Sequence, residues 1–317
     1  MSFSLLLRRA FVVAVLALPC GLVACRQERP AAAPVAPAGV PAKRLVVMAP
    51  SAAEMLAALG LSDAVVGVGD FVGWPPELAA RPKVGAYDQP SNEVILALGA
   101  TDFITTKSVA GAAAFTRLRE LGVDVVALDT STYDGTLEAM RTLGERFARQ
   151  AEAARLVERI QGAMASVRGR VAGMPRRRVL FVVGRDPIYA AGKGSHIDSL
   201  IDAAGGTNVA ADARSPYPQL ALEAVLARRP EVILDSSNNA AGAPVGRLSG
   251  WWAAWPFLPA VAERRVYFLE PARLSVPGPR LDRMVELMAK LVHPEVFGEA
   301  AESELGPLAG SDEPGAH

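Results

Sequence analysis

The chain has 317 residues, long enough for two core-bearing units, and its 33 Lys and Arg residues balance 33 Asp and Glu residues. The zero net charge argues against nucleic acid as a general partner, because nucleic-acid-binding proteins carry a basic surface. Only three histidines occur and one ends the chain, so a multi-histidine metal site is not expected.

The first 25 residues have the pattern of an export signal. Arg8 and Arg9 precede an apolar run over residues 10–18, which is too short for a stable membrane span. Residues 22–25, Leu-Val-Ala-Cys, resemble the cleavage box of bacterial lipoproteins, which predicts a mature chain that begins at Cys25 and carries lipid on its sulfur. Plain secretion with cleavage nearby is the alternative. Cys20 would be removed, so no partner is left for a disulfide.

Residues 26–42 are rich in Pro and Ala and predict an extended tether. A first α/β lobe is expected over residues 43–133. Apolar runs at 44–48, 64–68, 103–105 and 123–128 predict strands, and helices are expected at 52–59, 93–98 and 112–121. Ser51 and Glu54 have capping-box spacing at the start of the first helix. Buried strands that alternate with helices favour a parallel sheet covered on both faces.

Residues 136–172 contain no proline, and their apolar residues recur at steps of three and four. This period predicts one long amphipathic helix within an inter-lobe segment, residues 134–173. Two ordinary helices with a turn near Gly162 are the alternative, because each glycine costs about 1 kcal/mol in a helix.

A second lobe is expected over residues 174–297, with strands at 178–183, 232–235 and 266–269 and helices at 197–204, 223–227 and 277–291. Residues 298–317 are polar and punctuated by Gly and Pro, which predicts a flexible tail. The Gly-Lys-Gly-Ser run at 192–195 lacks the order of a phosphate loop. No carboxylate pair or dinucleotide fingerprint stands out, so no catalytic residue is assigned.

Two similar lobes imply a cleft between them, since ligands of α/β sheets bind beyond the carboxyl ends of the strands. The loops expected there supply an aromatic lining with few charges, which suits a large, flat, partly apolar ligand. Local packing is the alternative for each aromatic, and a surface salt bridge is the alternative for the one arginine. The candidate lining side chains are Phe71, Trp74, Tyr87, Tyr189, Tyr217 and Arg273.

Glu93 and Glu223 occupy matching positions, because each opens a short helix with a similar sequence in its lobe. An acidic residue at a helix start is favoured by the helix dipole, so capping accounts for each one alone. Their pairing across two lobes also suggests two negative contacts for a two-fold partner.

At family level, the sequence resembles the substrate-binding proteins of bacterial ABC importers for cobalamin, haem and ferric siderophores. The resemblance covers roughly residues 44–297 and rests on three segments. The segment 84–98 resembles the first-lobe signature, and 191–209 resembles the second-lobe signature. The segment 215–226, with Ser-Pro-Tyr-Pro-Gln-Leu, resembles the cobalamin-binding branch in particular.

This resemblance implies an α/β fold in which two similar lobes with mainly parallel sheets are joined by one long rigid helix, with the ligand cleft between them. It implies capture of a corrinoid and delivery to a permease dimer with its ATPase subunits, and Glu93 and Glu223 would meet arginines of that permease. Tyr87 falls where the cobalamin binder has a lining aromatic, whereas the ligating tyrosine of haem binders falls on Ala86. Backbone groups of Ser51 and Gly192 would contact the polar rim of the ligand.

We therefore expect a monomeric, lipid-anchored binding protein on the periplasmic side of the cell envelope, with no resident cofactor, no metal and no enzymatic activity. A haem or ferric-siderophore binder is the alternative within the family. An enzyme that acts in the same cleft, or a structural lipoprotein, is the alternative from another class.

Overall fold

A computed structural model describes residues 43–87, 89–107, 113–237, 246–247 and 250–306. These residues belong to one compact unit, Ala42–His317. The expected signal segment, the lipidation site at Cys25, the tether and residues 307–317 lie outside the described part, so those predictions stay predictions.

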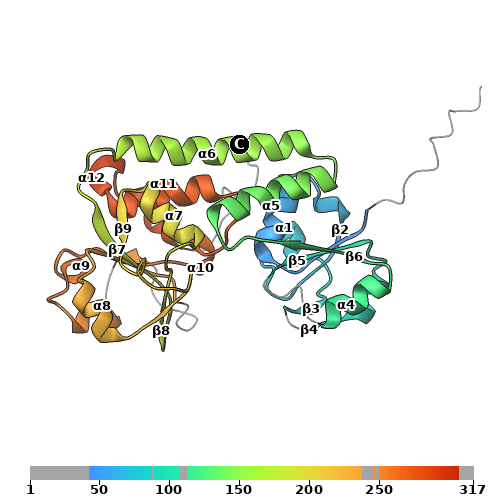
Figure 1. Cartoon of the computed structure of the whole chain (residues 1–317), viewed down its shortest axis with the longest axis horizontal. Coiled ribbons are helices and arrows are strands. Elements are labelled where there is room, and N and C mark those ends of the chain that lie inside the picture. Colours follow the sequence, from blue (N-terminus) through green and yellow to red (C-terminus); the bar gives the residue numbers. More distant parts are fainter. Residues whose placement is uncertain (1–42, 88, 108–112, 238–245, 248–249, 307–317) are drawn as a thin grey trace, which may run out of the picture. The chain divides into compact units, whose positions relative to one another are not determined.

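The first lobe is built on a four-stranded sheet in the order β2-β1-β5-β6. All its pairings are parallel, and the middle strands β1 and β5 are buried almost throughout, as expected of strands covered on both faces. Figure 1 shows α1, α4 and α5 around this sheet. The strands are β1 (Leu45–Val47), β2 (Val65–Val68), β5 (Asp102–Thr106) and β6 (Asp124–Leu128), with a small hairpin of β3 (Gly85–Ala86) and β4 (Gln89–Pro90).

Helices alternate with these strands as the sequence predicts. They are α1 (Pro50–Ala58), η1 (Ser62–Ala64), α2 (Pro76–Ala79), α3 (Asn92–Ala97), α4 (Ala113–Glu120) and α5 (Tyr133–Arg146). The expected capping box at the start of the first helix is wrong. Helix α1 begins two residues earlier, at Pro50, whose fixed φ suits the first turn, so Ser51 lies inside the helix. The side chain of Glu54 instead bonds Arg280 of the second lobe.

The segment between the lobes is two helices and not one. Helix α5 ends at Arg146, Ala148 adopts a left-handed conformation with φ 54°, and α6 (Gln150–Arg170) follows. The break comes just after Gly144, where the two helices approach closely: a Cβ at Gly144 would lie 2.6 Å from the Cβ of Ala153. Gly162, the position expected for an alternative turn, lies within α6.

Helix α6 is the long helix of the fold. It packs on α5 of the first lobe and on α7 (His196–Ala203) and α11 (Leu281–Val292) of the second, as Figure 1 shows. Its narrow apolar face supplies the buried Leu156, Ile160 and Met164, and its outer face is charged. The spacer that the periodicity predicts is therefore present, but it starts at residue 150.

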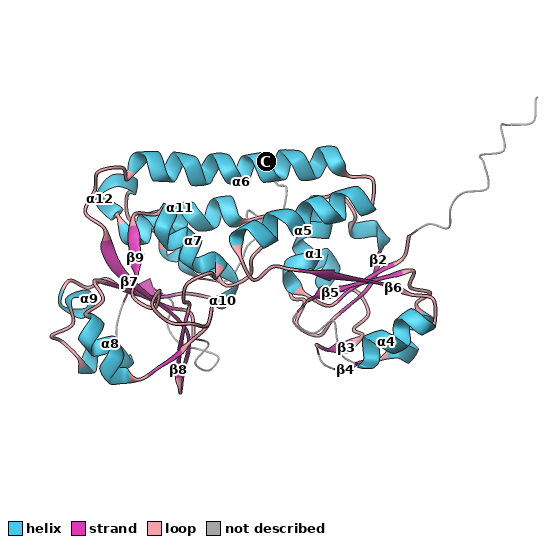
Figure 2. Cartoon of the chain, in the orientation of Figure 1, coloured by secondary structure: helices cyan, strands magenta, loops and turns pink. Residues whose placement is uncertain are grey.

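The second lobe contains a seven-stranded mixed sheet in the order β10-β8-β7-β11-β13-β12, with β9 pairing the first half of β7. The pairings of β7 with β11 and of β11 with β13 are parallel, and those of β8, β10 and β12 are antiparallel. Figure 2 shows β7, β8 and β9 of this lobe in magenta. The strands are β7 (Arg177–Arg185), β8 (Ile188–Ala190), β9 (Gly206–Asn208), β10 (Gln219–Leu220), β11 (Val232–Asp235), β12 (Gly246–Arg247) and β13 (Val266–Phe268).

The remaining helical segments of this lobe are short. They are α8 (Leu222–Arg228), η2 (Gly250–Ala254), α9 (Pro259–Ala262), α10 (Pro271–Leu274), α12 (Pro294–Phe297) and α13 (Glu302–Leu305). Helix α13 corrects the expectation of a flexible tail from residue 298. Leu305 is buried, its carbonyl accepts the backbone N–H of Glu270, and Lys290 pairs with Glu304 at 2.6 Å, so the chain is folded onto this lobe up to Gly306.

The two lobes share one apolar core. A single cluster of buried side chains runs from β1 and α1 through α5 and α6 to β7, α7 and α11. Smaller clusters lie under the outer face of each sheet. The lobes are therefore continuous through the α5–α6 layer and are not two independent globules.

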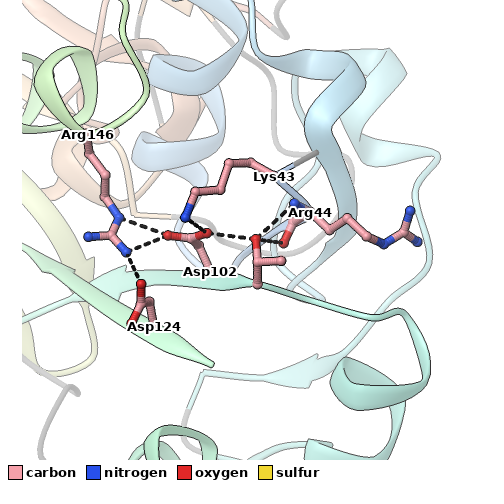
Figure 3. Close-up of polar contacts among 6 residues, drawn as sticks. Lys43, Arg44, Asp102, Asp124 and Arg146 are labelled. Carbon is pink, nitrogen blue, oxygen red and sulfur yellow. Dashed lines mark hydrogen bonds and ion pairs between the residues drawn. The ribbon is translucent and has the colours of Figure 1, made fainter. Parts of the chain in front are cut away.

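A polar network closes the first lobe where the chain enters it (Figure 3). The buried carboxylate of Asp102 accepts hydrogen bonds from Lys43 at 3.0 Å, from Thr101 at 2.7 Å and from Arg146 at 2.9 Å, and Arg146 also bonds Asp124. Burial alone would raise the pKa of Asp102, but the bonds from Thr101, Lys43 and Arg146 outweigh it and lower the pKa. The network ties the first described residue to the end of α5.

Candidate functional site

A pocket of about 780 Å³ lies between the two lobes. Its first-lobe wall comes from the start of α1 and from residues at the carboxyl ends of β5 and β6, and its second-lobe wall comes from two loops. This is where parallel sheets bind ligands, and the volume lies within the range of small-molecule sites. The lining residues are Pro50, Ser51, Tyr87, Thr106, Lys107, Leu128, Asp129, Thr130, Ser131, Pro216, Tyr217, Ser275, Val276 and Pro277.

Three of the residues proposed from the sequence are brought together here. Ser51 lies in the first turn of α1, Tyr87 follows β3, and Tyr217 comes from the loop before β10. Tyr87 and Tyr217 thus supply one aromatic ring from each lobe. The ligand cleft between the lobes, which the sequence predicted, is present.

Both tyrosines are neutral phenols at physiological pH. Burial raises the pKa of Tyr87, and a hydrogen bond with Thr106 opposes the shift only in part. Burial also raises the pKa of Tyr217. Rings that are neutral and apolar on their faces, with a hydroxyl at the edge, suit a flat ligand with a polar periphery.

The first-lobe wall is more polar than the aromatic lining expected from the sequence, although its charges are few. This wall carries Lys107 and Asp129, together with hydroxyl groups of Thr106, Thr130 and Ser131. These residues are absent from the candidates proposed from the sequence, although residues 106–107 and 129–131 directly follow two predicted strands. The same rule about carboxyl ends of strands, applied to every strand, would have found them.

Asp129 is held in a defined orientation. One of its oxygens, Oδ1, accepts both the backbone N–H of Ser131 at 3.1 Å and its hydroxyl at 2.6 Å. The other oxygen, Oδ2, lies 3.9 Å from Nζ of Lys107. The bonds from Ser131, assisted by the charge of Lys107, lower the pKa of Asp129, so this carboxylate is ionised at neutral pH.

Gly192 is not among the described lining residues, but it supports the loop that carries Tyr217. Its N–H donates to the carbonyl of Pro216 at 2.8 Å, and a Cβ on it would lie 2.7 Å from the carbonyl oxygen of Ser215. Only glycine allows this close approach of the loop that carries Tyr217. This N–H therefore positions the loop, and contact of a backbone group of Gly192 with the ligand stays a prediction.

Three proposed aromatics do not line this pocket among the residues that the structure describes. Phe71 is 66% exposed beyond β2, and Tyr189 of β8 is 40% exposed beside Gln219 of β10. Trp74 precedes a cis proline, and its indole Nε1 is buried with no hydrogen-bond partner among the described atoms. Their ligand contacts stay predictions.

Arg273 is also placed away from the pocket lining. Its side chain is buried in α10, and its guanidinium donates to the carbonyl of Ser303 at 2.8 Å and to that of Gly306. It fastens the C-terminal segment, so we leave it out of the proposed ligand contacts.

Glu93 and Glu223 occupy equivalent places in the two lobes. Each is the second residue of its helix, α3 or α8, and each helix lies between a two-residue strand and a central strand of the sheet. Both side chains are exposed, and neither makes an ion pair or hydrogen bond with another described residue. Helix α3 has its cap from Ser91, so the stability of that helix does not require Glu93 for capping.

Comparison with known proteins identifies the family. Residues 45–272 match the family model described as periplasmic binding protein. The chain belongs to the periplasmic binding protein family. The match covers both sheets up to α10, and this family is a class of substrate-binding proteins and not of enzymes. No helix in the described ranges is long and apolar enough to span a membrane.

Individual members of the family refine the comparison. A cobalamin-binding protein of Halobacterium salinarum is 30% identical over 266 residues, which is 79% of this chain and 69% of that protein. The crystal structure of the periplasmic vitamin B12-binding protein of Vibrio cholerae is 26% identical, with a TM-score of 0.68 over 80% of this chain and 97% of that one. The periplasmic haem-binding protein of Vibrio cholerae, 21% identical, has a TM-score of 0.70 over 79% and 99% and shares the fold.

Proposed function

We propose that this protein is the substrate-binding component of an ABC importer that captures cobalamin or a related corrinoid between its lobes. The observation that carries the proposal is the inter-lobe pocket, with Tyr87 and Tyr217 from opposite lobes and a polar wall at the ends of β5 and β6. A corrinoid is a flat macrocycle with polar side chains around its edge, so it matches both features. The vitamin B12-binding and cobalamin-binding relatives support this ligand.

A haem binder of the same family is the second candidate, and the pocket favours it less. Tyr87 is the nearby phenol that would have to bind iron as a phenolate, but burial raises its pKa and its hydroxyl is bonded with Thr106. The preceding residue, which matches the position of the ligating tyrosine of haem binders, is Ala86. The paired charges of Lys107 and Asp129 also give the carboxylates of haem little net attraction.

Calorimetric titration of the purified protein with cyanocobalamin and haem tests the ligand. We expect cyanocobalamin to bind at least about 100-fold more tightly, a difference of about 2.7 kcal/mol. Tighter binding of haem would overturn the corrinoid assignment and leave the family intact. Recovery of the bound corrinoid unchanged after long incubation would agree with a binding protein that performs no reaction on it.

For delivery, Glu93 and Glu223 would dock on arginines of a permease dimer, since both carboxylates are exposed at equivalent places of the two lobes. The double variant Glu93→Arg, Glu223→Arg should abolish corrinoid uptake by cells and leave the affinity of the purified protein unchanged, because neither residue lines the pocket. Replacement of an exposed carboxylate of α5, Glu138→Arg, is the matched control and should leave uptake intact. Unchanged uptake by the double variant would refute the docking role.

We further propose that lipid on Cys25 holds the mature protein at a membrane, on the periplasmic side, with residues 26–42 as the tether. Metabolic labelling with a fatty acid should mark the wild-type protein and not the Cys25→Ala variant. Equal release of both forms into the soluble fraction would favour plain secretion.

A further inference from the structure

The inter-lobe pocket carries one charged pair, Lys107 and Asp129, which we call the amide clamp. Lys107 follows β5 and Asp129 follows β6, two neighbouring parallel strands, so the sheet fixes the spacing of their backbones. Their side chains are 66% and 45% exposed, with Nζ and Oδ2 3.9 Å apart. A pair this open to solvent adds little to stability, so the fold has no structural need for it.

The orientation of the pair leaves one donor and one acceptor for a ligand. Oδ1 of Asp129 is occupied by Ser131, whereas Oδ2 faces Lys107 across a gap longer than a hydrogen bond. Lys107 is the donor on the other side of the gap, because an ammonium group has N–H bonds and no acceptor. Both groups line the pocket beside Thr106 and Thr130.

The spacing matches a primary carboxamide. The oxygen and nitrogen of an amide lie about 2.3 Å apart, as follows from the C=O and C–N bond lengths. Two hydrogen bonds of about 2.9 Å, one from Nζ to the amide oxygen and one from the amide NH₂ to Oδ2, close a ring when Nζ and Oδ2 are 3.9 Å apart. Both bonds include an ionised partner and are therefore of the stronger kind.

We propose that Lys107 and Asp129 bind one carboxamide of the corrinoid edge and so select amidated corrinoids over ligands that present a carboxylate there. A carboxylate has no N–H for Oδ2, and its charge is repelled by Asp129 while Lys107 attracts it. Asp129 therefore offsets most of the binding affinity that Lys107 alone would provide for an acid. This inference rests on the proposed function, because it assumes a corrinoid in the pocket.

The test compares cyanocobalamin with its monocarboxylic acids, in each of which one side-chain amide is hydrolysed. Titration calorimetry is performed on the wild type, on Asp129→Asn, and on Glu138→Gln as a matched control, since Glu138 is an exposed carboxylate on α5 that is ion-paired with Arg141. For the wild type we expect one acid to bind about tenfold more weakly than the amide, as for the loss of one charge-assisted hydrogen bond.

Asp129→Asn should bind cyanocobalamin about tenfold more weakly and should lose the preference for the amide over that acid, while Glu138→Gln keeps both. Lys107→Met should weaken binding of the amide, and of the acid still more, because Asp129 then repels the carboxylate of the acid unopposed. An amide-to-acid ratio that is the same in Asp129→Asn and in the wild type overturns the clamp but leaves corrinoid binding in place. If the wild type binds no corrinoid, the proposed function fails and the clamp fails with it.

Discussion

Replacement of Arg280 by Met should destabilise the protein strongly, because Arg280 forms a buried ion pair that joins the two lobes. Its Nε and Nη2 each donate to one oxygen of Glu54 at 2.8 Å, and Nη2 also donates to the carbonyl of Ala272 at 3.0 Å. Both side chains are at most 5% exposed. Burial raises the pKa of Glu54, although the bonds and charge of Arg280 oppose this shift, so desolvation is the larger effect.

The expected cost follows from that desolvation. Removal of one partner of a buried ion pair leaves the other charge unpaired and typically costs about 3–5 kcal/mol. We expect Arg280→Met to cost about 4 kcal/mol. The double variant Glu54→Leu, Arg280→Met should recover most of this loss, because two apolar side chains of similar size avoid the desolvation of both charges.

Urea unfolding followed by circular dichroism measures the effect. With a slope of about 2.5 kcal/mol per M, the midpoint for Arg280→Met should fall by roughly 1.5 M, in one transition because the lobes share a core. Arg159→Met is the control: its pair with Asp282 also joins two helices, but Arg159 is 38% exposed and the cost should stay under about 1 kcal/mol. A cost for Arg280→Met no larger than that of the control would refute the reasoning.

Three further changes test other parts of the structure. Asp102→Asn should cost about 3 kcal/mol in urea unfolding at pH 7. Because folding lowers the pKa of Asp102, its stabilisation is present above the unfolded pKa of about 4 and is lost as the pH falls through the lower folded pKa. The difference in stability between wild type and Asp102→Asn should therefore shrink at pH 3. Gly192→Ala should weaken corrinoid binding about tenfold in calorimetry, because it displaces the loop that carries Tyr217. Gly162→Ala, in open space within α6, should stabilise the protein by about 0.5–1 kcal/mol and leave binding unchanged. Tyr217→Phe should keep the corrinoid affinity within about threefold, while Tyr217→Ala should lose about tenfold; an unaffected Ala variant would exclude ring contact.

Local patterns in the sequence predicted the elements well, because burial on both faces of a parallel sheet requires continuous apolar runs such as those of β1 and β7. They predicted less about contacts between distant segments. Glu54 and Arg280 are 226 positions apart, so the local spacing that suggested a cap for Glu54 gave no sign of its real partner. The position of the break between α5 and α6 depends on the close contact of Gly144 with Ala153, which only the folded pair of helices reveals.

The candidate site was predictable where strand ends and aromatics coincide, as at Tyr87 and Tyr217. Arg273 was assigned to the ligand because it follows a strand, but α13 folds back and supplies carbonyl acceptors for its guanidinium. Lys107 and Asp129 belong to no motif and gain their significance only from the adjacency of β5 and β6. The strand-end rule marks each of the two as a candidate, but sequence spacing does not show that they lie side by side.

The coupling of the lobes determines how a ligand would be released. Helix α6 packs on helices of both lobes, and one apolar cluster runs through both. Glu54, which pairs with Arg280, lies one turn along α1 from Ser51, which lines the pocket. Relative motion of the lobes would break this pair and open the shared core, at a cost of several kcal/mol. Because of that cost, we expect ligand binding to leave the lobes nearly in place.

Pulsed electron–electron double resonance, which measures the distance between two spin labels, tests this expectation. Spin labels on cysteines at Leu121 and Phe257, exposed positions in the first and second lobes, report the inter-lobe distance. Cyanocobalamin at saturation should shift the mean distance by less than about 2 Å, as in pre-organised complexes. A shift of about 5 Å or more, as expected for hinge closure, would show that ligand binding alone opens the shared core. A small shift would agree with our proposal that the permease opens the lobes through Glu93 and Glu223.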